Sequence, residues 1–76
     1  MNDRVYKMTT MVAERISALQ SDGYLLVVKY VHSRGGFWKL RHRTNHNLIT
    51  LNASFEHDSM TQTSNGRVVY SGPIQP

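Results

Sequence analysis

Cations and aromatic residues alternate along a short run near the middle of this 76-residue chain. Residues 37–43 read FWKLRHR, and the odd-numbered members are one aromatic residue followed by three cations. In a β-strand, successive side chains point to opposite sides, so these four side chains would share one face. Cations at alternate positions can follow the phosphates of a nucleic acid, and exposed rings can stack on unpaired bases. The spacing therefore favours a surface that binds a polyanion.

The distribution of charge supports the same interpretation. The chain carries nine Lys or Arg and five Asp or Glu, a net charge of +4, and all five carboxylates lie outside residues 23–55. A net charge of this size is also common in small domains, and solvated cations can protect a sheet from aggregation. No recognised RNP, helix-turn-helix or zinc-finger motif is present, so the pattern indicates a class of partner and no particular sequence.

The predicted contacts extend to the strands on either side of this run. We expect Tyr30 and His32 on the cationic face of the preceding strand and neutral donors on the following one. The predicted nucleic-acid contacts are Tyr30, His32, Arg34, Phe37, Lys39, Arg41, Arg43 and Asn52. The leading hypothesis is a small non-enzymatic module that binds RNA or DNA, or has a regulatory role. The alternative is a protein-interaction module, either a homodimer or an inhibitor of an acidic protein. Apolar Leu26, Val28 and Leu48, expected on the same face, favour that alternative because exposed apolar patches mark interfaces.

Metal binding and catalysis are weaker hypotheses. His42 and His46 flank a predicted turn and could approach one ion, but no Cys completes a ligand set. His32 could act as a base in metal-free RNA cleavage, with Lys39 and Arg41 stabilising the charge. A single histidine on a basic strand is more often a phosphate contact. We therefore expect no enzyme, no catalytic residue, no metal and no cofactor.

An amphipathic helix is predicted over residues 3–21. Its apolar stripe is spaced at three and four residues and comprises Val5, Met8, Val12, Ile16 and Leu19. Asn2 or Asp3 can cap its start, and Gly23 can take the left-handed conformation after its end. This stripe needs an apolar sheet face as its partner.

Three antiparallel strands are predicted between Tyr24 and Phe55. Gly35-Gly36 is the expected first turn, which would place Leu25, Val27 and Val31 on the face of Trp38 and leave Leu26 and Val28 outside. A two-residue turn at Asn45-His46 would set Trp38 opposite Ala53, Leu40 opposite Leu51 and His42 opposite Ile49. In that register Arg43 lies opposite Leu48, and the apolar and polar sets separate onto two faces. Because strand 24–33 is apolar on both faces, we expect the C-terminal segment or a second subunit to cover its outer side.

A second hairpin is predicted at residues 60–71, with Asn65-Gly66 as its turn. Val69 is expected to face away from Val68 and Tyr70, and the tail is expected to be irregular from about residue 72. The fold class is thus α+β: one domain over residues 1–76, with an N-terminal helix packed on a four- to five-stranded antiparallel meander. No apolar run is long enough to span a membrane and no signal-peptide pattern is seen, so we expect a cytoplasmic protein without a membrane partner.

This order of elements is similar, in topology alone, to that of Sm-like RNA-binding proteins, although no Sm motif residues match. The run GGFWKLRH also resembles small RNA-cleaving toxins of the HicA and RelE kinds. HicA-type chains carry a histidine after Gly-Ser, whereas Phe37 follows Gly36 here, and their closing helix is not predicted.

Overall fold

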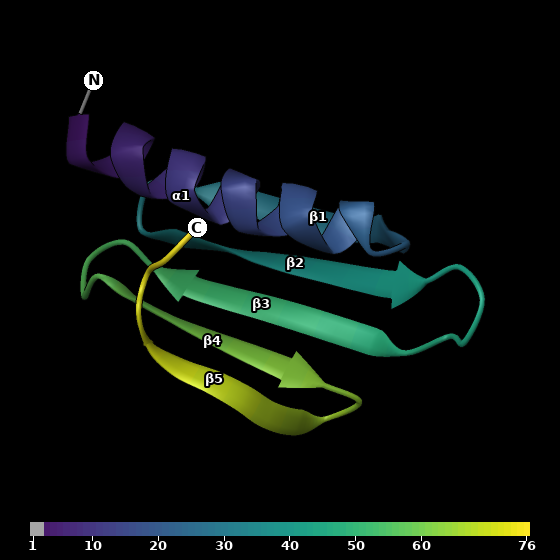
Figure 1. The fold of residues 1–76 in the computed structure, drawn as a ribbon. Helices are drawn as coiled ribbons and strands as arrows, with labels where there is room; N and C mark the ends of the chain where they lie inside the picture. Colours follow the sequence, from purple (N-terminus) through teal and green to yellow (C-terminus); the bar gives the residue numbers. More distant parts are fainter. Residues whose placement is uncertain (1–2) are drawn as a thin grey trace.

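The chain forms one helix packed on one face of a five-stranded sheet, as a computed structural model of residues 3–76 shows (Figure 1). Side chains are described from Val5 onward. The elements are α1 (Asp3–Ser21), β1 (Tyr24–His32), β2 (Gly35–His42), β3 (Leu48–Ser54), β4 (Ser59–Ser64) and β5 (Arg67–Pro73). Every strand pairs antiparallel with its sequence neighbours, in the order β1-β2-β3-β4-β5. The predicted α+β class, with a helix on an antiparallel meander, is confirmed.

Helix α1 buries the stripe that its sequence predicts. Val12 and Ile16 are buried, and four partly buried side chains pack beside them: Val5, Met8, Met11 and Leu19. The helix ends where the Asp22 and Gly23 amides donate to the Leu19 and Gln20 carbonyls, and Gly23 has a φ of +99°. Only glycine adopts this conformation without steric cost. The expected cap at Asn2 or Asp3 lies outside the described side chains. No helix in the described part of the chain is long and apolar enough to cross a membrane.

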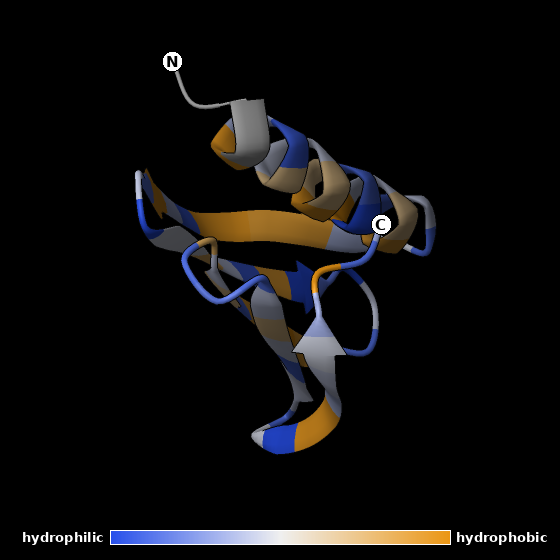
Figure 2. Cartoon of the chain, turned by 90° about the vertical axis from the view of Figure 1, so that its left-hand side faces the viewer, coloured by the Kyte–Doolittle hydropathy of each residue, from blue (hydrophilic) through white to orange (hydrophobic). Residues whose placement is uncertain are grey.

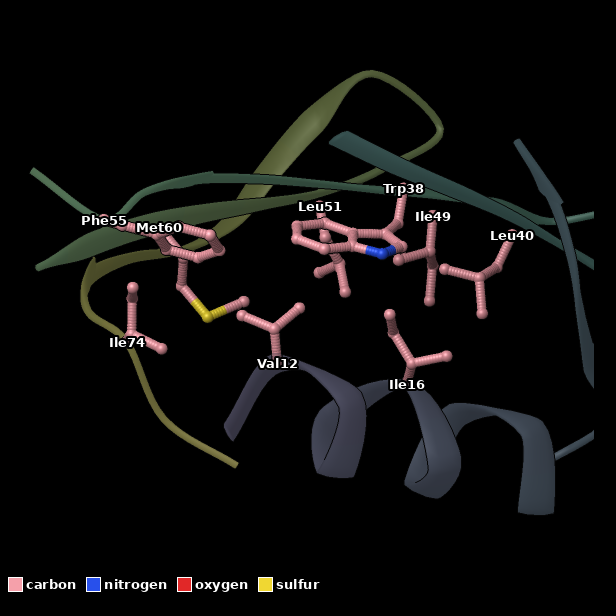
Figure 3. Close-up of a cluster of buried hydrophobic side chains, with 9 residues drawn as sticks. All are labelled: Val12, Ile16, Trp38, Leu40, Ile49, Leu51, Phe55, Met60 and Ile74. Carbon is pink, nitrogen blue, oxygen red and sulfur yellow. The ribbon is translucent and has the colours of Figure 1, made fainter. Parts of the chain in front are cut away.

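The core lies between α1 and the inner face of the sheet (Figure 3). The sheet contributes Trp38 and Leu40 from β2, Ile49 and Leu51 from β3, Met60 from β4, and Phe55 from the turn after β3. The predicted apolar faces of β2 and β3 are therefore confirmed. Ile74 completes the cluster from beyond β5, at 6% exposure, next to Met60 in Figure 3.

The first turn differs from the prediction. It is formed by Ser33 and Arg34, neither of which has a positive φ, and both glycines lie inside β2. The glycines are there because neighbouring atoms approach too closely for a side chain. A Cβ on Gly35 would lie 2.1 Å from the Ala53 carbonyl oxygen, and one on Gly36 would lie 2.5 Å from the Trp38 ring.

The second turn differs from the prediction in its length. The loop covers residues 43–47, with a positive φ at His46, and sets Trp38 opposite Leu51 and Leu40 opposite Ile49. This register is two residues away from the expected one. Because side chains alternate with a period of two, the shift leaves both faces intact. The predicted pairing of Arg43 with Leu48 is wrong, since Arg41 takes that place.

Strand β1 carries a bulge that reverses its predicted faces at one end. Its register shifts between Leu26 and Val28, so that Val27 is the additional residue. Leu26 pairs with Leu40 and packs on the core, whereas Leu25 pairs with Arg41 on the outer face. The predicted positions of Leu25, Leu26 and Val27 are therefore wrong, because one inserted residue exchanges inside for outside.

The C-terminal hairpin extends the sheet and does not cover the outer side of β1. Asn65 and Gly66 form its turn with positive φ, as predicted. The register shift between Gln62 and Thr63 puts Val68 and Tyr70 on opposite faces, contrary to expectation. In Figure 2 the helix and the C-terminal segment lie on the same side of the curved sheet. No element within residues 3–76 forms a layer over the opposite side.

Candidate nucleic-acid interface

The outer face is the side of the sheet that points away from α1. On this face, residues of β1, β2 and β3 that pair directly with one another form three successive rows across the sheet, here called rungs. The rungs are Tyr30–Phe37–Asn52, Val28–Lys39–Thr50 and Leu25–Arg41–Leu48. Consecutive rungs are two residues apart on β2 and β3, or roughly 6.6–6.8 Å. On β1 the bulge leaves three residues between Val28 and Leu25. The structure thus brings an aromatic rung next to two cationic ones on one continuous surface.

The aromatic rung is accessible from solvent. Tyr30 is 63% exposed, and Phe37, directly opposite it, is half-buried. The rings of Tyr30 and His32 lie 5.5 Å apart between centroids, tilted by 56°. Two exposed rings and a phenyl side chain in neighbouring positions offer stacking surfaces at the end of the sheet near the first turn.

His32 is fixed in orientation by the turn that follows it. Its Nδ1 accepts a hydrogen bond from the backbone amide of Arg34, at 3.2 Å. A neutral imidazole whose Nδ1 accepts carries its proton on Nε2, so His32 presents a donor. A donor suits a phosphate oxygen. The same bond occupies the nitrogen that a general base would need free in this tautomer.

The cations of the predicted set fall into two groups. Lys39 and Arg41 stand on adjacent rungs of β2, the first half-buried and the second exposed. Arg34 is exposed in the turn beside His32. Arg43 lies in the loop after β2, and its backbone amide donates to the Gly23 carbonyl at 3.0 Å. Arg43 is therefore not a rung of the ladder, in contrast to its predicted place.

The outer face near these cations is free of acidic neighbours on its own rungs. Each rung partner of Lys39 and Arg41 is apolar or a threonine. The rung of Lys39 continues through Thr63 to Val68 on β5. Val68 is 58% exposed. The bulge in β5 that brings it there has no marker in the sequence.

His42 has a structural position at the other end of the sheet. Its Nε2 lies 2.8 Å from the Asp22 carbonyl oxygen, and its Nδ1 accepts from the Thr44 amide at 3.2 Å. Since Nδ1 accepts, Nε2 carries the proton and donates to Asp22. The ring also packs edge-on against Tyr24. His42 thus joins the end of α1 to the loop after β2.

The remaining histidines are dispersed. His46 is exposed in the loop of residues 43–47, and His57 is exposed in the turn between β3 and β4. Among the described residues, no group of three or more His, Cys, Asp or Glu could hold a metal ion.

A groove lies on the inner side of the sheet, between α1 and the free edge of β1. Its volume is about 240 Å³. The helix contributes Thr9, Ala13 and Ser17 to its wall, and the strand contributes Lys29 and Val31. Lys29 pairs with Trp38, so this cation of the basic stretch stands on the opposite face from Lys39 and Arg41.

Comparison with protein-family models, with curated proteins and with solved structures finds no match for this chain.

Proposed function

We propose that the protein binds single-stranded nucleic acid across its outer face. The observation that carries the proposal is the adjacency of the Tyr30–Phe37 rung to Lys39 and Arg41 on an uncovered sheet face. Rings can stack on bases while the two cations contact the phosphates of the same strand. Arg41 can also bind a phosphate through two parallel hydrogen bonds.

A single strand fits this surface better than a duplex does. The bases of a duplex are stacked on one another, and their faces are not accessible to protein rings. Stacking on an aromatic side chain contributes about 1–3 kcal/mol per base and tolerates any sequence. Asn52 and Thr50 add neutral donors beside the aromatic and cationic side chains. We therefore expect low sequence specificity and a clear preference for unpaired strands.

A salt titration with short labelled RNA and DNA strands tests the proposal by fluorescence anisotropy. If Arg34 contacts a phosphate as well as Lys39 and Arg41, log K should fall with log salt at a slope of about −2. Arg41→Ala should weaken binding to all sequences and flatten the slope by about 0.7 on single strands. Arg67→Ala removes the same charge from β5, where Arg67 pairs with Ser64 on the inner side of the sheet. This control should leave the slope unchanged.

Phe37→Ala separates stacking from charge. It should leave the salt slope intact and cost about 1–3 kcal/mol on single strands, with a smaller effect on duplexes. Absence of binding at low salt would contradict the proposal. Equal binding of acidic polypeptides with matched charge would contradict it as well.

The second candidate function is recognition of a protein partner through the same face. Leu25, Val28 and Val68 are exposed there by 56%, 41% and 58%. Exposed apolar side chains rimmed by polar ones mark protein interfaces. Preference for acidic polypeptides over nucleic acid in the titration would favour this function.

A further inference from the structure

The two edges of the sheet differ in how well they are protected against pairing. β5 carries Arg67, a bulge opposite Gln62–Thr63, and Pro73, which has no amide hydrogen. Such features prevent a sheet edge from binding another strand. β1 also has one charge, Lys29, and a bulge, at Val27, but the stretch after the bulge is regular and contains no proline. In that stretch Val28, Tyr30 and Val31 are 40–63% exposed. A long, apolar edge strand is a template for an additional strand.

We propose that a second copy of this chain pairs with the free edge of β1, antiparallel and across a twofold axis. This makes one continuous sheet from the two copies, with both helices on one side and both outer faces on the other. The proposal does not depend on nucleic-acid binding. It differs from a dimer formed face to face through the outer surface, because the outer face stays open.

The backbone of β1 restricts the possible registers. The turn between β1 and β2 has two residues, so His32 and Gly35 close the hairpin as a mutually bonded pair. Alternate residues then face β2, and Lys29 and Val31 direct their N–H and C=O groups toward the free edge. A second β1 strand must therefore set these two residues opposite Lys29 or Val31 of its own.

Charge and the end of β1 together favour one register among these. Lys29 opposite Lys29 would place like charges directly across the pair, which is destabilising. Val31 opposite Val31 would place Lys29 opposite Ser33, beyond the end of β1. The remaining arrangement sets Lys29 of one copy opposite Val31 of the other, twice, and centres the axis on Tyr30. It uses residues 28–32, the regular part of β1 beyond the bulge at Val27.

The groove beside the edge leaves room for this arrangement on the inner side. Lys29 and Val31 project along it, opposite small side chains of α1, namely Thr9, Ala13 and Ser17. The inner-side residues of a second copy can thus pack next to those of the first without displacing the helix. On the outer side, the exposed rings of Tyr30 from both copies meet at the axis. The paired segment has five residues in each copy, fewer than the roughly 20–30 residues a side of a standard interface, so we expect a Kd in the micromolar range.

Sedimentation equilibrium of the full chain from about 1 to 300 μM tests the dimer by mass action. Val31→Lys places two Lys–Lys pairs across the axis and should weaken association at least tenfold. Val31→Glu places a carboxylate opposite Lys29 of the other copy and should keep or strengthen it. Val68→Lys adds the same charge at a similarly exposed valine on β5 and should have no effect. Circular dichroism checks that each variant is folded.

Three results would overturn the proposal. These are a monomer throughout the concentration range, equal weakening by Val31→Lys and Val31→Glu, and a dimer that Val68→Lys disrupts. Salt separates this inference from the proposed function. Two copies of charge +4 repel each other, so screening should strengthen dimerisation, whereas it should weaken nucleic-acid binding. The experiments can therefore refute dimerisation without refuting nucleic-acid binding, and the reverse.

A disulfide trap tests the register directly, since the chain has no native cysteine. At the axis, Tyr30 meets its own copy in a pair that is not hydrogen-bonded, with Cα atoms about 4.5 Å apart. That separation lies within the range for a disulfide. Tyr30→Cys should oxidise rapidly to a covalent dimer, and Val68→Cys should not. Equal rates for the two variants would contradict the register.

Discussion

Gly36→Ala should destabilise the fold because the Trp38 ring occupies the space that the new methyl group needs. A Cβ at Gly36 would lie 2.5 Å from Cη2 of the ring and 3.0 Å from two further ring carbons. The ring is 3% exposed and packs in the core with side chains of β2, β3 and α1, so a shift that makes room for the methyl group disturbs these contacts. Overpacking of this kind costs about 1–3 kcal/mol.

That cost is a large fraction of the total stability. A chain of this length is expected to be stable by roughly 4–11 kcal/mol. Each kcal/mol lowers the Tm of a domain of this size by about 4–8 °C. Urea unfolding followed by far-UV circular dichroism measures the loss without depending on the tryptophan itself.

A double-mutant cycle with Trp38→Leu identifies the cause. In the Trp38→Leu background the colliding ring is absent, and Gly36→Ala should be neutral or stabilise by up to about 1 kcal/mol, because alanine reduces the freedom of the unfolded chain. The matched control is Gly35→Ala, whose Cβ meets the backbone oxygen of Ala53 at 2.1 Å. Its cost should be the same in both backgrounds. The reasoning is refuted if Gly36→Ala is also additive with Trp38→Leu to within about 0.5 kcal/mol.

Three further substitutions probe the rest of the fold. His42→Phe keeps a ring beside Tyr24 and removes the hydrogen bonds to Asp22 and Thr44, so urea unfolding should show a loss of about 1–3 kcal/mol; an unchanged midpoint would contradict the structural role. Ile74→Ala should cost about 2–5 kcal/mol as a core truncation, while exposed Gln75→Ala should cost almost nothing; equal effects would show that the C-terminal segment is not part of the core. Arg41→Ala should change the free energy of unfolding by less than about 0.5 kcal/mol, and a larger loss would mean that its binding defect reflects misfolding.

The sequence predicted the inner and outer faces of β2 and β3 more reliably than their register. Trp38, Leu40, Ile49 and Leu51 are all buried, although the loop after β2 has five residues where two were expected. The predicted register was wrong by two residues, and a shift by an even number of residues keeps every side chain on its predicted face. Loop length was not predictable because Asn45-His46 satisfies the composition of a tight turn, while the actual loop is set by His42 bonding Asp22 and Thr44.

The faces of residues in the first half of β1 were predicted wrongly because of the bulge at Val27, which the composition of the strand does not reveal. Leu25, Leu26, Val27 and Val28 are all apolar, so no change of polarity marks the inserted residue. The prediction that Gly35-Gly36 forms the first turn was wrong for a different reason. A pair of glycines signals either positive φ or a close approach of other atoms, and only the positions of Ala53 and Trp38 show that close approach applies here. The members of the predicted binding set that lie on strands share the outer face, whereas Arg34 lies in the turn after β1 and the longer loop removed Arg43 from the ladder.

The strictly sequential strand order has a consequence for how the chain acquires its structure. Each strand pairs only with the strand made immediately before or after it, so most backbone pairing closes short loops and can proceed as a series of hairpins. Low sequence separation between contacting residues favours rapid folding. The helix is an exception, because Arg15 bonds Gln62 and Val12 shares the core with Ile74. During synthesis the sheet can therefore assemble progressively, whereas the helix gains its full set of contacts only after Ile74 has emerged.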